Sequence, residues 1–249
     1  HSSGMVHQSP FPNSSLRQIR WPGANLYRNP FGELTRQERA QLAVVDLGSV
    51  LQVLCRSDAT AERLRTDGQL PTDGPLAPEF CSHQAYQLIG ECGRGKTTQM
   101  LAFGQRIPAA AYVYLPEDAP CPSIPDAELL LIDEAQRLPP PVRRRIFQSG
   151  RPMVLATHTD LSRALRQSGY QVTTERIGLT LSPERLVEIL NRRIESSRRG
   201  TDQPTPRVTE PIAEELIRRF GTNIRAIEGY LYDLVQSQVD DHGEMRFIE

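Results

Sequence analysis

One eight-residue motif restricts the fold of this chain more than any other feature of its sequence. Residues 90–97 read GECGRGKT and match the pattern G-x-x-x-x-G-K-[S/T] at every position. Glycines at these positions let backbone N–H groups turn inward around phosphate oxygens, and the following helix presents its positive N-terminal end. The motif predicts a phosphate-binding loop (P-loop) that holds ATP or ADP. The residues expected to contact the nucleotide are Gly90, Glu91, Cys92, Gly93, Arg94, Gly95, Lys96, Thr97 and Thr98.

The composition supports this prediction through a single lysine. The chain has 28 arginines and one lysine, and that lysine is Lys96. Arg and Lys are not interchangeable where a compact ammonium group must enter a tight backbone loop. We therefore expect Lys96 to reach the β and γ phosphates and Thr97 to hold Mg²⁺.

A pair of carboxylates follows the most apolar run of the chain. Leu129 to Ile132 read as a strand that is buried on both faces, and Asp133 and Glu134 come directly after it. Ligands of α/β sheets bind at the carboxyl ends of the strands. We expect Asp133 to hold Mg²⁺ through water and Glu134 to activate the water that attacks the γ-phosphate.

A further apolar run, Pro152 to Thr157, ends in the polar residues Thr157 and His158. One of the two side chains could contact the γ-phosphate or the attacking water. They could equally be a core hydroxyl and a core imidazole whose hydrogen bonds are satisfied internally. Of the two, Thr157 is the preferred catalytic candidate.

Strand-like and helix-like segments alternate through the middle of the chain, which favours a parallel sheet. Strands are predicted at Tyr86 to Ile89, Ala111 to Leu115, Leu129 to Ile132, Pro152 to Thr157 and Gln171 to Thr174. From Ser182 onward the apolar residues follow a helical period only. The expected fold is therefore an α/β P-loop NTPase, with a parallel sheet flanked by helices and a small C-terminal all-helical lid.

These patterns set the expected domain boundaries. A capping box at Thr35 to Glu38 predicts a helix that continues, with a break near Gly48, to Leu54. Residues 66–84 are rich in Gly and Pro and predict a loop. We expect a tag remnant at 1–4, an extended or disordered arm at 5–33, the P-loop ATPase core at 34–181, the lid at 182–239 and a tail at 240–249.

The P-loop, the Asp133-Glu134 pair, the polar strand end and the helical lid together resemble an AAA+ ATPase. Within that superfamily the chain is most similar to bacterial replication initiators and to transposition or secretion ATPases. The segment TERIGL at 174–179 resembles their arginine-finger segment, which implies that Arg176 reaches the γ-phosphate of a neighbouring subunit. The segment GTNIRAIEG at 221–229 resembles their sensor-2 motif, which implies that Arg225 lies over the subunit's own nucleotide.

The chain departs from this family between its second and third predicted strands. Only 37 positions separate Lys96 from Asp133, and residues 117–125 are rich in proline. The helix that normally lies there is expected to be missing or very short. Because initiators carry DNA-contacting elements in that region, the departure weakens the expectation that DNA binding is inherited.

Charge gives a separate argument about DNA. Residues 137–225 hold 17 arginines and nine acidic residues, although the net charge of the whole chain is −1. A basic half can meet DNA or another polyanion, or it can be an ordinary solvated surface. Arginines cluster at 143–145, 192–193 and 198–199.

Composition also excludes some classes of protein. No run approaches the ~18 apolar residues of a membrane helix. The four cysteines form no zinc-binding spacing, and without a secretory signal they read as reduced thiols of a cytoplasmic protein.

Two functions remain as hypotheses. The first is an AAA+-type ATPase, with Lys96, Glu134, Thr157 and Arg176 as catalytic residues, that forms a homo-oligomer on binding ATP and acts on a partner, with DNA as one candidate. The second is a nucleotide-dependent switch or binding module that hydrolyses ATP slowly as a monomer.

Overall fold

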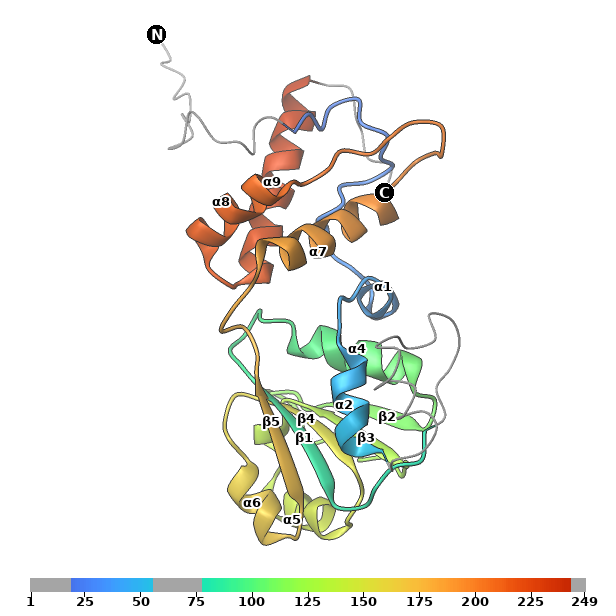
Figure 1. Cartoon of the computed structure of the whole chain (residues 1–249), viewed down its shortest axis with the longest axis vertical. Coiled ribbons are helices and arrows are strands. Elements are labelled where there is room, and N and C mark those ends of the chain that lie inside the picture. Colours follow the sequence, from blue (N-terminus) through green and yellow to red (C-terminus); the bar gives the residue numbers. More distant parts are fainter. Residues whose placement is uncertain (1–18, 56–77, 243–249) are drawn as a thin grey trace. The chain divides into compact units, whose positions relative to one another are not determined.

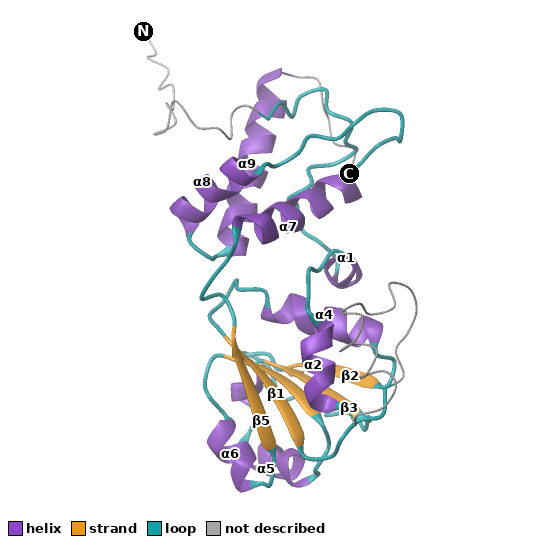
Figure 2. Ribbon diagram, in the orientation of Figure 1, coloured by secondary structure: helices purple, strands orange, loops and turns teal. Residues whose placement is uncertain are grey.

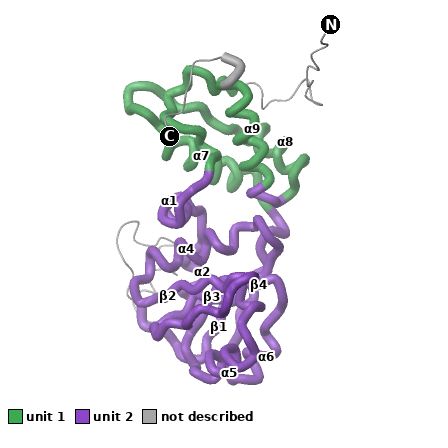
Figure 3. The backbone as a smooth tube through the Cα atoms, turned by 180° about the vertical axis from the view of Figure 1, so that it is seen from behind, with its two compact units in different colours: residues 1–32, 181–221, 226–249 green, residues 33–180, 222–225 purple. Residues whose placement is uncertain are grey.

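The computed structural model describes residues 19–55 and 78–242, and the chain divides into two compact units (Figure 3). The sheet unit comprises Glu33–Thr180 and Thr222–Arg225, and the helical unit comprises the described parts of His1–Gly32, Leu181–Gly221 and Ala226–Glu249. The predicted tag remnant, much of the predicted arm and tail, and most of the loop predicted at 66–84 lie outside the described residues.

The sheet unit is built on five parallel strands in the order β2-β3-β4-β1-β5 (Figures 1 and 2). Each predicted strand is present, with ends shifted by at most two residues. Because all five strands run in the same direction, their carboxyl ends lie at one edge of the sheet. The strands are β1 (Gln84–Ile89), β2 (Ala110–Tyr114), β3 (Leu129–Asp133), β4 (Met153–Thr157) and β5 (Gln171–Arg176).

Helices cover both faces of this sheet (Figure 1). Alternate residues of β3 point to opposite faces, so Leu129 and Leu131 pack with the helices α2 (Leu47–Leu54) and α4 (Lys96–Arg106). Leu130 and Ile132 pack on the other face with α5 (Pro140–Gln148) and α6 (Ser162–Gln167). Every residue of β3 is buried, as the unbroken apolar run predicts for a central parallel strand.

The segment before β1 differs from its prediction in one respect. Thr35 caps α1 (Arg36–Gln41) with the expected capping box. The break that follows lies at 42–46 rather than near Gly48, because the Asp46 side chain accepts a hydrogen bond from the N–H of Ser49 at 3.1 Å and starts α2 there. Gly48 lies inside the first turn of α2.

Residues 115–128, between β2 and β3, are fully described and contain no helix. The prediction from the short spacing and the prolines is confirmed at this point. The chain passes from β2 to β3 through an irregular, Pro-rich connection, which begins beside Arg137 of the 3₁₀ turn Ala135–Arg137.

The helical unit contains α7 (Pro183–Ser196), α8 (Glu210–Phe220) and most of α9 (Ile224–His242). Ser182 caps α7, with Pro183 at its first position, as predicted. Residues 19–32 add no helix or strand to this unit, but Trp21 and Phe31 are buried in its apolar core, in edge-to-face contact with each other.

Three of the clustered arginines of the helical unit are held by its own acidic residues. Arg193 is buried, pairs with Glu228 at 2.7 Å and donates to the carbonyl of Pro30 at 2.9 Å, so it joins α7 to α9 and to the N-terminal segment. Arg192 and Arg198 pair with glutamates of α7. These three side chains are therefore engaged within the helical unit.

The predicted fold class is therefore confirmed: the chain has a parallel sheet flanked by helices, a P-loop after its first strand and a C-terminal group of helices. No helix among the described residues is long and apolar enough to cross a membrane.

Candidate functional site

The P-loop leaves β1 and enters α4 through two glycines in the left-handed region, Gly93 at φ 77° and Gly95 at φ 92°. Gly90 opens the loop, and its N–H donates to the carbonyl of Thr157 at 3.2 Å. The helix that follows has 11 residues and places its free N–H groups at the loop. This combination of turned backbone and helix N-terminus is what a phosphate group requires.

Lys96 lies inside this loop and is only 5% exposed. Its Nζ donates to the carbonyl of Gly90 and, at 2.9 Å, to that of Glu91. Burial lowers the pKa of the Lys96 ammonium, while the nearby carboxylates of Glu134 and Asp133 act in the opposite direction. The ammonium is therefore held among carbonyl oxygens that phosphate oxygens could replace.

The other predicted loop residues lie around this centre. Cys92 is exposed, and none of the four cysteines, all of which lie among the described residues, forms a disulfide. Glu91 and Arg94 form an exposed ion pair at 3.2 Å. Thr98 is half-buried in the first turn of α4.

Asp133 ends β3 and is completely buried. It accepts hydrogen bonds from the hydroxyls of Thr97 and Tyr112, the latter at 3.0 Å. Burial raises the pKa of Asp133 above its ordinary value, against these hydrogen bonds, which lower it. A cation next to this carboxylate would offset the cost of burying its charge.

The donor set fits Mg²⁺. Thr97 and Asp133 offer a hydroxyl and a carboxylate oxygen in mutual contact, and Mg²⁺ prefers one or two protein oxygens, with waters and phosphates completing its shell. Within the described residues, no group of three or more His, Cys, Asp or Glu side chains could hold a metal ion.

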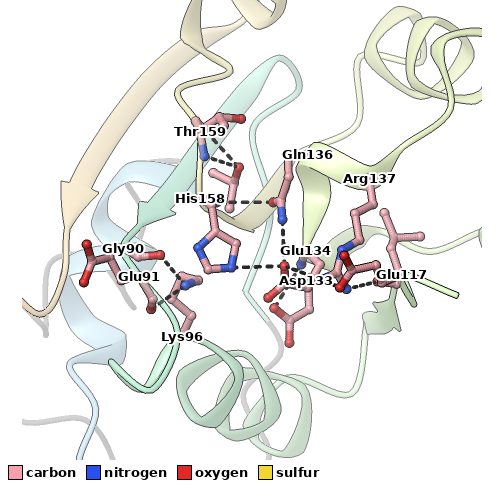
Figure 4. A network of polar contacts seen from close by, with 12 residues as sticks. Gly90, Glu91, Lys96, Glu117, Asp133, Glu134, Gln136, Arg137, His158 and Thr159 are labelled. Carbon is pink, nitrogen blue, oxygen red and sulfur yellow. Dashed lines mark hydrogen bonds and ion pairs between the residues drawn. The ribbon is translucent and has the colours of Figure 1, made fainter. Parts of the chain in front are cut away.

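Glu134 is the centre of a polar network (Figure 4). It has φ 60° in the left-handed region and is 8% exposed. Its Oε2 accepts from Gln136 Nε2 at 2.6 Å and lies 3.2 Å from His158 Nε2 and 3.6 Å from an Arg137 nitrogen. Three donor groups therefore face one carboxylate oxygen.

The end of β4 separates the two polar candidates. Thr157 is fully buried, and its hydroxyl is engaged with the backbone of Thr159, accepting from its N–H at 3.1 Å and donating to its carbonyl at 2.8 Å. His158, one residue further, is the residue that faces Glu134. The structure thus gives Thr157 a local hydrogen-bonding role and brings His158 to the predicted catalytic carboxylate.

Arg176 ends β5, paired in register with Ile89 at the end of β1, and its side chain is exposed. The next residue, Ile177, donates its N–H to the carbonyl of Ile89 at 2.8 Å. A Cβ on Gly90 would lie 2.7 Å from the carbonyl oxygen of Ile177, so the chain after β5 packs directly on the start of the P-loop.

Arg225 and its neighbours belong to the sheet unit, although they begin α9. A Cβ on Gly93 would lie 2.7 Å from Asn223 Oδ1 and 3.4 Å from the Cβ of Arg225. Thr222 accepts a hydrogen bond from Arg94 of the P-loop at 2.5 Å. The sensor-2-like segment therefore lies against its own P-loop.

Sequence reasoning missed three residues of this site: Tyr112, Gln136 and Arg137. Tyr112 supports Asp133 from β2, and Gln136 and Arg137 contact Glu134 from the turn after it. The available signal was position alone, because the two turn residues follow the carboxylate pair directly.

Comparisons with known proteins give fold-level likeness only. No protein-family model matches the chain, and no curated protein matches it. Among solved structures it is similar to a DNA replication initiation factor (14% identity, TM-score 0.46) and to the replication initiator DnaA bound to AMPPCP and single-stranded DNA (14% identity, TM-score 0.48). Each match covers 85% of this chain and 68% of the other.

Proposed function

We propose that this chain is a Mg²⁺-dependent ATPase of AAA+ type. The observation that supports it most is that the P-loop contacts the end of β3. The Thr97 hydroxyl is hydrogen-bonded to the Asp133 carboxylate. The carboxylates of Asp133 and Glu134 are close enough to Lys96 for their charges to act on the pKa of its ammonium group. Phosphate-binding, metal-binding and proton-accepting groups are thus gathered at one edge of the sheet.

Each group has a distinct part in the reaction. Lys96 exchanges its contacts with the carbonyls of Gly90 and Glu91 for the β and γ phosphates. Thr97 and Asp133 would hold Mg²⁺, which would supply charge neutralisation for the phosphates. Glu134 accepts a proton as the oxygen of a water forms a bond to the γ-phosphorus. The bond between that phosphorus and the β–γ bridging oxygen breaks, which gives ADP and phosphate.

The substitution Glu134→Gln tests this assignment. It removes the proton acceptor but keeps the shape of the side chain. We expect the kcat for ATP hydrolysis to fall by about 10²-fold or more, with the Kd for ATP unchanged within about twofold. Asp118→Asn, an exposed carboxylate in the connection after β2, is the matched control. Equal turnover by Glu134→Gln and wild type would assign the base to another residue.

Two arginines complete the proposed site. Arg225 lies against Gly93 and contacts the nucleotide of its own subunit. Arg176, exposed at the end of β5, contacts the γ-phosphate bound by a neighbouring subunit when ATP drives assembly. Such arginines contribute roughly 10³ to 10⁵ in rate in related enzymes.

The second candidate function, a slowly hydrolysing monomeric switch, is favoured by the contacts of Glu134. Its Oε2 already accepts a hydrogen bond from Gln136 and faces His158 and Arg137. A bound nucleotide would therefore either break these contacts or leave them in place. The mass of the protein particle in solution, measured with and without ATP, separates the two hypotheses. A larger mass with ATP supports the assembling ATPase, and a monomer mass under both conditions supports the switch.

DNA is the partner that the sheet unit's charge favours. Helices α5 and α6 pack into the same apolar cluster and contain no acidic residue. The arginines of α5 and α6, all at least partly exposed, are Arg143, Arg144, Arg145, Arg163 and Arg166.

A salt-dependent affinity for DNA would support this role if it falls when Arg143, Arg144 and Arg145 are changed to Gln. The substitution Arg199→Gln in the helical unit is the control and should leave the affinity unchanged.

A further inference from the structure

We propose that Gln136 is a positioning residue that fixes the Glu134 carboxylate for water activation by fastening it to the end of β4. This inference rests on the proposed ATPase function and adds a residue to it. Gln136 Nε2 donates to Glu134 Oε2 at 2.6 Å, and Gln136 Oε1 accepts the backbone N–H of His158 at 3.2 Å. One amide thus joins the residue after β3 to the residue after β4 (Figure 4).

The chemistry of the partners determines which way this amide points. A backbone N–H can only donate, so it must face the amide oxygen of Gln136. An ionised carboxylate can only accept, so it must face the NH₂ group. Reversing the amide would break both hydrogen bonds, and the contacts therefore select one orientation.

Local backbone geometry brings Gln136 to this position. Glu134 adopts φ 60° and ψ 41°, and the 3₁₀ turn Ala135–Arg137 follows at once. A non-glycine residue in this region costs on the order of 1 kcal/mol, so the surrounding contacts must maintain it. The turn brings the side chain two positions later back to Glu134.

The two other donors near Glu134 are less able to hold its carboxylate in place alone. Arg137 lies 3.6 Å from Glu134 Oε2. Its guanidinium also donates to the carbonyl of Leu115 at 2.9 Å and pairs with the carboxylate of Glu117 at 3.3 Å. His158 reaches the same oxygen from 3.2 Å with a side chain that is 30% exposed. Gln136 makes the shortest of the three contacts.

All three of these groups face Oε2. In this proposal the other oxygen, Oε1, is the one that accepts the proton of the water. Gln136 therefore acts through Glu134 and does not itself touch the reacting atoms. Its loss should lower kcat and leave nucleotide affinity unchanged.

The experiment compares Gln136→Ala, Gln136→Asn and Gln136→Glu with wild type. Glu has the shape of Gln and can still accept from the His158 N–H, but it places a carboxylate opposite Glu134. We expect kcat for ATP hydrolysis to fall roughly 10- to 100-fold in the Ala and Glu variants and less in Asn, with the Kd for ADP within about twofold of wild type. Gln148→Ala, an exposed residue of α5, is the matched control and should behave as wild type.

Amide hydrogen exchange at His158 gives a second readout that does not need turnover. Gln136→Ala should speed exchange of this amide by about tenfold, whereas Gln136→Glu should leave it protected. Wild-type turnover in Gln136→Glu would reduce Gln136 to a space-filling role. Unchanged exchange in Gln136→Ala would show that the hydrogen bond to His158 is not made. Absence of hydrolysis by wild-type protein would instead contradict the proposed function, and the two failures are thus distinguishable.

Discussion

Gly93 and Gly95 occupy the same kind of backbone conformation in different surroundings. Both have a positive φ, 77° and 92°, which costs any other residue about 1 kcal/mol or more. A Cβ on Gly95 would meet no atom within 4 Å, whereas a Cβ on Gly93 would lie 2.7 Å from Asn223 Oδ1. The two positions therefore separate backbone strain from steric conflict.

We predict that Gly93→Ala lowers the free energy of unfolding more than Gly95→Ala does. Gly95→Ala should cost about 1 kcal/mol through its φ alone, and Gly93→Ala should cost more because the methyl group must displace the segment that contains Arg225. Urea unfolding without nucleotide measures both. Equal losses would mean that this segment does not pack on the P-loop in solution.

The motif residues were the predictable part of the site. Lys96, Thr97, Asp133 and Glu134 stand in patterns whose chemistry is fixed by spacing along the chain. Gln136 was not predictable, because its hydrogen bond to His158 depends on β3 and β4 being neighbours, which spacing does not show.

At the scale of elements, one buried amide joins three segments of the sheet unit. Gln87 of β1 is completely buried. Its Nε2 lies within 2.8 Å of oxygens of Asp160, Ser162 and Thr174, and its Oε1 accepts from the N–H of Leu161 at 3.0 Å. The network fixes the start of α6 and strand β5 against β1.

This network makes stability depend on the ionisation of Asp160. Hydrogen bonds from Ser162 and then from Gln87 lower the pKa of Asp160 from 3.8 to about 2. A group whose pKa is lower in the folded state than in the unfolded state stabilises the protein at pH values above its unfolded-state pKa. That stabilisation is lost as the pH falls through its folded-state pKa. We predict that wild type exceeds Asp160→Asn in Tm at about pH 6, and that the difference shrinks as pH falls from 3.8 towards 2. A difference that does not change over this range would contradict the assignment.

Elements were predicted where a single pattern determines them. The strands were found from apolar runs, and α1 and α7 from their caps at Thr35 and Ser182. The start of α2 was placed wrongly because Gly48 was read as a helix breaker, whereas the Asp46 side chain determines where that helix begins. Local capping outweighed the weak helix propensity of one glycine.

At the scale of the whole molecule, the sequence did not show that residues 19–32 belong with the C-terminal helices. Trp21 and Phe31 are buried among residues of α7, α8 and α9. These contacts join residues about 200 positions apart, such as the Asn29 amide and the Tyr232 carbonyl, and no local pattern encodes them.

Assembly through Arg176 is the prediction that belongs to this scale. Lys96→Ala and Arg176→Ala proteins should each be inactive, and mixing them should restore part of the ATPase activity. A Lys96→Ala subunit still offers its neighbour an intact Arg176. ATPase rate across mixing ratios, at concentrations that permit assembly, measures the effect. An absence of recovery would leave Arg176 with a role in its own subunit, where it lies beside Ile89.

The central claim is that the loop from Gly90 to Thr97 binds a nucleoside triphosphate, and calorimetry with ATP and ADP in magnesium buffer tests it most directly. Wild-type protein should bind both nucleotides, and Lys96→Ala should bind about 10- to 100-fold more weakly, because a charge-assisted contact to phosphate is lost. Folded wild-type protein that takes up neither nucleotide would contradict the account.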